Sequence, residues 1–217
     1  AFAVPGGVAR PLAPEARDQL RAGLPAALAA AERTLGWWRE RLPRLADEAA
    51  SCGSFETPFL AMVGSAGELA FCEGRLRLVS ARGELLEDGL DPARYPELVA
   101  EEPVPWSYLK QPHWRSLGLP AGAYRVGPLA RLNAARRCGT PRADRELGEF
   151  RKLGDGAVLS TFHAHGARLV EILHGIERIA ELLDDPEILG REGLAPPAAP
   201  SAEGARACAA PRRTLFP

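Results

Sequence analysis

The sequence predicts an α+β protein, mainly α, in which a long-helix bundle carries a small inserted antiparallel β meander. Three observations predict this class. Residues 24–45 and 162–183 each repeat apolar side chains at alternating spacings of three and four, which is the period of one helix face. Between them, residues 75–79 alternate polar and apolar side chains, as a half-buried strand does.

The first helical region is expected over residues 13–50. Pro25 and Pro43 lie within its pattern, and each removes a backbone donor and clashes with the preceding turn, so we expect a kink or a helix restart at each. Trp37 is interpreted as flank and Trp38 as core. The apolar stripe consists of Leu24, Leu28, Ala31, Leu35, Trp38, Leu42 and Leu45.

The β meander is expected over residues 56–88. Residues 59–63 and 68–72 are apolar runs on either side of a Gly-containing segment, so they are interpreted as two strands around a tight turn. The alternating segment 75–79 supplies the next strand.

The rest of the chain divides into three parts. Residues 89–133 are rich in Pro, Gly and aromatic side chains, and we expect an ordered, irregular segment that packs against the helices or sheet. Helix returns over residues 144–185 and ends at Asp184-Asp185-Pro186, since proline disfavours helix at the residue before it. Residues 190–217 lack periodicity and are expected to form a tail, flexible or docked.

Composition excludes several classes of partner. The net charge of -1 gives no argument for nucleic acid or an anionic membrane, and no basic–aromatic interleaving suggests nucleic acid. No apolar run reaches the roughly 18 residues of a membrane span, and the first residues lack the features of a signal peptide. Because the chain starts without methionine, and Met62 is its only one, we expect an excised or processed piece.

The four cysteines are dispersed, so the sequence offers no zinc or iron–sulfur site. Reduced intracellular thiols are favoured over disulfides, which predicts a cytoplasmic protein. Cys138 follows Arg136 and Arg137, whose guanidinium groups could lower its pKa and make it reactive. An ordinary thiol is the favoured interpretation.

Other candidate groups favour structural roles. His163 and His165 point about 200° apart on a helix, while His174 shares a face with His163 but lies three turns away, so His163 is not expected to ligate one metal directly with either; a structural or partner-packing role is favoured. The adjacent carboxylates Glu101-Glu102 and Asp184-Asp185 are interpreted as solvated turns or helix ends, because nothing sets their pKa values apart. No phosphate loop or nucleophile elbow is present.

A family resemblance extends this interpretation. The block from Ser107 to Asn133, with SYLK and YRVGPLARLN, resembles the large (alpha) subunit of nickel–iron hydrogenases in the NAD-, viologen- or deazaflavin-reducing branch. The opening Ala3–Val8, the helical stretch Ala167–Leu173 and the terminal Ala210-Pro211-Arg212 resemble the same family in the same order. Residues 1–217 would then be a single partial domain of such a large subunit.

The resemblance implies a function, a cofactor and partners. In that family a nickel–iron centre is held by two CxxC pairs, and the arginine of an APRG motif lies over the metals. Only that arginine carries over, as Arg212, with Pro211 lining the ligand pocket. Both CxxC pairs are missing, and Ala209 and Arg213 depart from the motif, so no cofactor is expected in this chain.

Three hypotheses remain open. The first is a central, inactive fragment of the large subunit, whose parent oxidises dihydrogen reversibly and passes electrons to an iron–sulfur small subunit. Diaphorase-type electron-transfer subunits would be further partners. The second is a metal-free, hydrogenase-like protein that serves as a scaffold or in assembly. The third is an unrelated helical binding domain.

Overall fold

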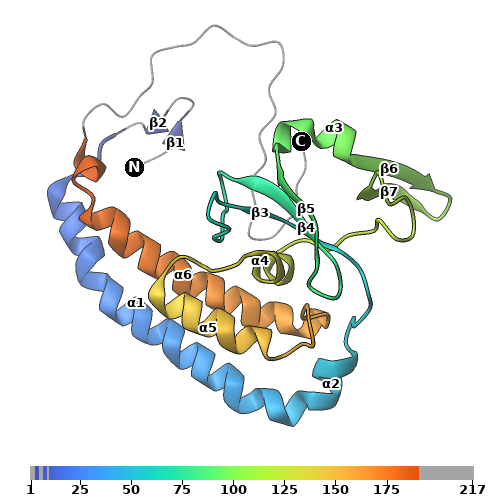
Figure 1. Cartoon of the computed structure of the whole chain (residues 1–217). Helices are drawn as coiled ribbons and strands as arrows, with labels where there is room; N and C mark the ends of the chain where they lie inside the picture. Colours follow the sequence, from blue (N-terminus) through green and yellow to red (C-terminus); the bar gives the residue numbers. More distant parts are fainter. Residues whose placement is uncertain (1–2, 5–6, 9, 191–217) are drawn as a thin grey trace, which may run out of the picture.

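Three long helices, a short buried helix and two small antiparallel sheets form most of the part of the chain that is described, residues 3–4, 7–8 and 10–190 of a computed structural model. Helices α1 (Pro14–Arg41), α5 (Pro141–Arg151) and α6 (Ala164–Asp184) lie side by side (Figure 1). The short helix α4 (Pro128–Ala134) lies between them and a sheet of strands β3 (Phe59–Val63), β4 (Arg75–Val79) and β5 (Leu85–Leu90). The predicted α+β class is confirmed.

Helix α1 continues through Pro25, whereas the helical region changes at Pro43. Pro14 occupies the first turn of α1, where its missing N–H costs nothing, and Pro25 lies inside a helix that continues to Arg41. At Pro43 the chain switches to the 3₁₀ segment η1 (Leu42–Leu45) before the short helix α2 (Ala46–Ser51). The expected restart therefore occurs at Pro43.

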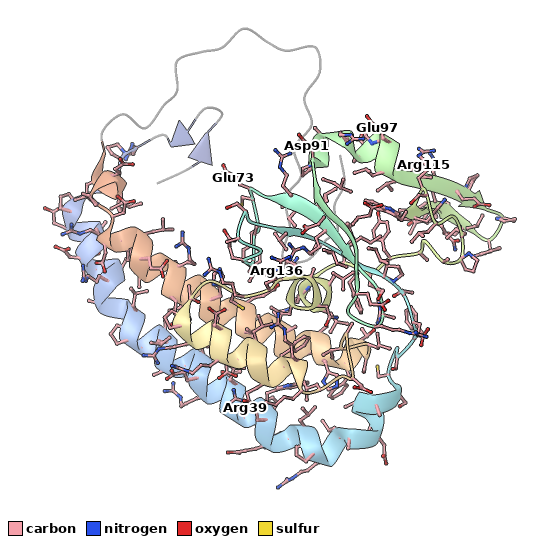
Figure 2. The ribbon with its side chains drawn as sticks, in the orientation of Figure 1. Arg39, Glu73, Asp91, Glu97, Arg115 and Arg136 are labelled. Atoms are coloured by element: carbon pink, nitrogen blue, oxygen red, sulfur yellow. The ribbon has the colours of Figure 1, made fainter. Side chains whose placement is uncertain are left out.

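Close contact between α1 and α6 depends on a glycine. A Cβ at Gly166 would lie 2.7 Å from the indole Nε1 of Trp38, whose ring stacks on Phe162 with centroids 5.4 Å apart. Trp38 therefore faces α6, as predicted, whereas Trp37 is exposed. Ion pairs of Arg39, which is labelled in Figure 2, with Glu146 and of Arg142 with Glu32 join α1 to α5.

The second helical region is not continuous over residues 144–185. Helix α5 ends at Arg151, and α6 begins at Ala164 after the 3₁₀ turn η3 (Thr161–His163). The loop between them contains Gly156 at φ 123°, where a Cβ would lie 2.7 Å from the carbonyl oxygen of Arg82. Glycine is required at this position because the loop approaches another backbone. Helix α6 ends at Asp184, as predicted.

The meander lacks the strand predicted at residues 68–72 and has instead an unpredicted strand, β5. Strand β4 pairs antiparallel with β3, Phe59 opposite Val79, and β5 pairs with the other edge of β4. Residues 68–72 make only isolated bridges, from Leu69 to Val63 and from Glu68 to Arg137. Residues 68–72 look like a strand in the sequence because a loop that packs on the core also needs apolar side chains.

The segment 89–133, expected to be irregular, contains a β hairpin. The 3₁₀ turn η2 (Pro92–Arg94) and helix α3 (Tyr95–Leu98) lead into β6 (Val99–Val104), which pairs with β7 (Ser107–Trp114). Prolines at positions 103, 105 and 112 hid the strand pattern, since proline is usually excluded from sheet interiors.

Smaller elements complete the description. Strands β1 (Ala3–Val4) and β2 (Gly7–Val8) pair with each other, and η4 (Pro186–Leu189) follows α6.

The hydrophobic core of the described residues has two main parts. One lies among α1, α4, α5, α6 and β3, and the other between the central sheet and the base of the hairpin around Trp114. The predicted tail from residue 191 onwards lies outside the described residues.

Candidate functional site

The motif-rich block from Ser107 to Asn133 forms β7, the loop after it and helix α4. Helix α4 is almost completely buried, with Ala130 and Leu132 fully inaccessible to solvent. Gly127 precedes it at φ 89°, a left-handed conformation that favours glycine, and Pro128 begins the helix. The block is thus built to place α4 at the centre of the molecule.

Arg125 holds together three segments that are distant in sequence. Its guanidinium donates hydrogen bonds to the hydroxyl of Thr57 at 2.9 Å, to the Phe55 carbonyl at 2.9 Å, and to the carbonyls of Gly53 and Leu159. The same group lies 4.5 Å and 4.6 Å from the ring centroids of Phe55 and Phe59. Burial lowers the pKa of Arg125, but an arginine stays protonated in a protein. Its role is to fix the loop before β3.

Arg131 and Glu171 form a buried, bidentate ion pair between α4 and α6. The distances are 2.5 Å from Nε to Oε1 and 2.9 Å from Nη2 to Oε2, and the side chains are 4% and 9% exposed. The guanidinium also lies over the Phe71 ring, 5.3 Å from its centroid. Because both charges are satisfied by each other, the pair fixes α4 on α6 and leaves no free proton acceptor.

Asn133 and Tyr124 complete the block. The Asn133 amide donates to the Val158 carbonyl at 3.0 Å and accepts from the Val158 N–H at 2.9 Å, so it substitutes for a strand partner. Burial, aided by the charge of Glu101, raises the pKa of Tyr124 to about 12, so its hydroxyl stays protonated. These side chains act as framework groups.

The histidines do not gather into a site. His174 Nδ1 lies 3.1 Å from the Thr140 hydroxyl, and its ring stacks on Phe71. His163 is buried, and its Nδ1 has no hydrogen-bond partner within the described residues. His165 lies beside Trp38 instead. The three histidines therefore lie in separate surroundings, and their structural or partner-packing role stays a prediction.

Cys138 is an inert thiol. Burial, followed by the charges of Asp144 and Glu171, raises its pKa to about 12. The Asp144 carboxylate accepts the backbone N–H of Cys138 at 2.5 Å, which places a negative charge close to the sulfur. The favoured interpretation of an ordinary buried thiol therefore agrees with the structure, in which burial and nearby carboxylates outweigh the one arginine that lowers the pKa, Arg151.

The paired carboxylates serve separate partners. Glu101 pairs with Lys110 across the hairpin at 3.2 Å, Asp184 pairs with Arg21, and Asp185 caps η4 by accepting the N–H of Glu187 at 2.9 Å. Neither pair forms a catalytic dyad.

The described residues do not fit a nickel–iron centre. Within the part of the chain that the structure covers, no three His, Cys, Asp or Glu side chains lie close enough to hold a metal ion. Of the three described cysteines, Cys138 is buried, whereas Cys52 and Cys72 are exposed. The predicted site residues Arg212 and Pro211, and also Cys208, lie outside the described residues, so their roles stay predictions.

Comparison with known proteins places this geometry in context. No family model matches the sequence. The vhu-type subunit of an F420-non-reducing hydrogenase from Methanococcus voltae is 33% identical over 214 residues, which are 98% of this chain and 50% of that protein. The NAD-reducing hydrogenase HoxS subunit beta of Cupriavidus necator is 33% identical over 224 residues, covering 98% and 45%. The chain is similar to half of a hydrogenase subunit.

A solved structure supports the same relationship. A crystal structure of an NAD⁺-reducing [NiFe]-hydrogenase in the H₂-reduced state superimposes with a TM-score of 0.83 and 35% identity, over 90% of this chain and 44% of that one. The chain thus spans about half the length of the relatives it matches, and those relatives are subunits of hydrogenases.

These names correct the assignment of subunit. The HoxS relative is a beta subunit, and a further relative from Archaeoglobus profundus, 34% identical over 169 residues, is the iron-sulfur subunit of an F420-non-reducing hydrogenase. Judged by these names, the prediction of a large (alpha) subunit is wrong. The function derived from it, with electrons passed to a separate iron–sulfur small subunit, is wrong for the same reason.

Sequence reasoning identified the residues of the framework but missed their roles. Arg125, Arg131 and Asn133 stand out as parts of a motif, whereas only the fold shows that each bridges α4 or its approach to a distant segment. A polar residue between apolar neighbours in a short helix was the available signal.

No described helix is long and apolar enough to cross a membrane.

Proposed function

We propose that the chain takes part in hydrogenase function as part of one subunit of a multi-subunit complex of the NAD-reducing or F420-non-reducing type. The observation that carries this proposal is the similarity over nearly the whole chain, at 33% identity and with a TM-score of 0.83. Arg131, which fixes α4 to α6 through Glu171, lies in the most motif-rich block of the chain.

The framework indicates what the described residues contribute. They position a buried helix and present outer surfaces, and no three of their His, Cys, Asp or Glu side chains cluster to hold a metal ion. On this proposal, any nickel and iron of the complex are held by residues outside the described part. Other subunits of the complex are the partners, and the candidates are iron–sulfur subunits and diaphorase-type electron-transfer subunits.

Two finer features follow from the same proposal. Ile172, Ile179 and Leu182 share an exposed face of α6, and each is about half exposed. This apolar face supports a larger helix bundle, completed in the assembled subunit by helices packed against α6.

The three described cysteines are free thiols, which supports the cytoplasm as the compartment.

Purification from the native host tests the proposal. An affinity tag on the chain should recover, by mass spectrometry, the other subunits of one hydrogenase complex in fixed proportion. The recovered complex should reduce NAD or benzyl viologen with dihydrogen as the electron donor, and elemental analysis should find nickel and iron. Recovery of the chain alone, together with unchanged hydrogenase activity in cells that lack it, would contradict the proposal.

A further inference from the structure

The β6–β7 hairpin exposes the three least buried large hydrophobic side chains of the described residues. Trp106 is 77% exposed, Tyr108 is 95% exposed and Leu109 is 63% exposed. All three lie at or next to the turn that joins Val104 to Ser107. Single exposed apolar residues are ordinary, but two aromatic rings and a leucine at one tip resemble the anchors of protein interfaces.

The base of this hairpin is fixed, whereas its tip projects away from the helices (Figure 1). Trp114 is 2% exposed and packs with Leu98 and Val99 in the second part of the core. The Arg115 guanidinium donates to the carbonyls of Pro96 at 2.9 Å, Glu97 at 3.1 Å and Val99 at 3.2 Å. Arg115 and Glu97 lie at this base in Figure 2. An ordered base limits the entropy lost when the tip is bound.

The two strands are poorly suited to adding a further strand. Pro103 on β6 and Pro112 on β7 have no N–H group to donate to a neighbouring chain. Backbone pairing along either edge is therefore interrupted. Recognition must come from the side chains of the tip.

The charges beside the tip indicate what kind of surface it fits. Glu101 is neutralised by Lys110, but Glu102 has no ion-pair partner within the described residues. A two-fold contact between hairpins of two copies would bring the two Glu102 carboxylates towards each other, and like charges at a contact are unfavourable. The acidic flank therefore favours a different chain with basic residues at that position.

We propose that the β6–β7 tip inserts into an apolar pocket, rimmed by arginine or lysine, on another subunit of the hydrogenase complex. The inference rests on the proposed function, because it takes the complex as the source of the partner. Trp106 and Tyr108 are the anchors, and Glu102 meets the basic rim. Tryptophan and tyrosine each bury about 150–250 Å² and are enriched among residues that dominate binding energy.

Two experiments with the tagged full-length chain test the inference. A photo-reactive benzoylphenylalanine at Leu109 should cross-link to one identified subunit of the complex. The double variant Trp106→Ala/Tyr108→Ala should weaken binding of that purified subunit at least thirtyfold, roughly the effect of losing one interface hot spot. Glu102→Gln should weaken binding less and make it less sensitive to salt.

Trp37→Ala is the matched control, because Trp37 is a half-exposed tryptophan on α1, a helix that lies away from the hairpin in Figure 1. It should leave binding unchanged, and circular dichroism should show all variants folded. If the wild-type chain recovers the complex and the double variant recovers it equally well, the proposed function stands and the hairpin inference is overturned. Cross-linking to a second copy of the chain also overturns it. Failure of the wild-type chain to recover any hydrogenase subunit contradicts the proposed function itself.

Discussion

Removing one partner of the Arg131–Glu171 pair should destabilise the protein far more than removing both. In Glu171→Leu the Arg131 guanidinium, whose side chain is 4% exposed, would lose its bidentate carboxylate and keep its charge in the core. Breaking a buried pair in this way costs about 3–5 kcal/mol. Since each kcal/mol shifts the melting temperature of a domain this size by about 2–4 °C, the variant should melt about 6–20 °C lower.

The double variant Arg131→Met/Glu171→Leu separates the burial of an unpaired charge from the loss of packing. With both charges gone, an apolar pair of similar volume should recover most of the lost stability. Methionine can keep the contact that the arginine makes with the Phe71 ring. The free energy of unfolding is measured by urea titration with tryptophan fluorescence as the signal.

A surface pair provides the control. Glu149→Gln breaks the exposed ion pair with Lys152 and should leave the urea midpoint unchanged within error. The reasoning is refuted if Glu171→Leu is as stable as the wild type. It is also refuted if the double variant is no more stable than the single one, since an unpaired buried charge would then not be the cause.

Three further predictions concern other buried groups. Asn133→Leu removes both hydrogen bonds to the Val158 backbone and leaves the N–H and carbonyl of Val158 unsatisfied. It should lower the free energy of unfolding, measured by urea titration, by about 2–5 kcal/mol. A loss near zero would mean that water replaces the amide. Cys138, with its pKa raised to about 12, should resist iodoacetamide at pH 8 in the native protein and react only in urea, while Cys52 and Cys72, which are exposed, react at once. Peptide mass spectrometry decides this, and native labelling of Cys138 would contradict its burial. Burial lowers the pKa of both His163 and His174, so the unfolded chain binds more protons below about pH 6.5; stability should be complete above that pH and fall as the pH decreases through it. His163→Leu should reduce this pH dependence of the urea midpoint, and an unchanged slope would exclude His163 as a source.

Much of the fold could be predicted because its signals are local. The end of α6 at Asp184 follows from a proline two residues later, and the switch to 3₁₀ structure at Pro43 follows from the same chemistry. The strand at residues 75–79 was found because its polar and apolar side chains alternate at the period of a strand. These features depend on residues that are close in the sequence, so they can be predicted without knowing the rest of the structure.

Other elements escaped prediction because distant contacts decide them. Residues 68–72 look like a strand, but hydrogen bonding with Arg137 and Val63 keeps them as a bridged loop. The hairpin was hidden because prolines on strands with free edges are tolerated there, and a sequence does not show which strand is an edge. The break between α5 and α6 depends on Gly156 meeting the Arg82 backbone across the fold.

In the candidate site, too, some properties follow from the sequence and others depend on contacts between distant segments. The resemblance to hydrogenases, the lack of CxxC pairs and the polar residues that accompany α4 can all be read from the amino-acid sequence, although the subunit inferred from it was wrong. Only the tertiary structure decided that Arg131 is neutralised by Glu171, that Cys138 is a protonated buried thiol, and that Trp106 and Tyr108 project into solvent. The physical reason is that charge state and exposure depend on what surrounds a side chain in space, and those surroundings come from segments far away in the chain.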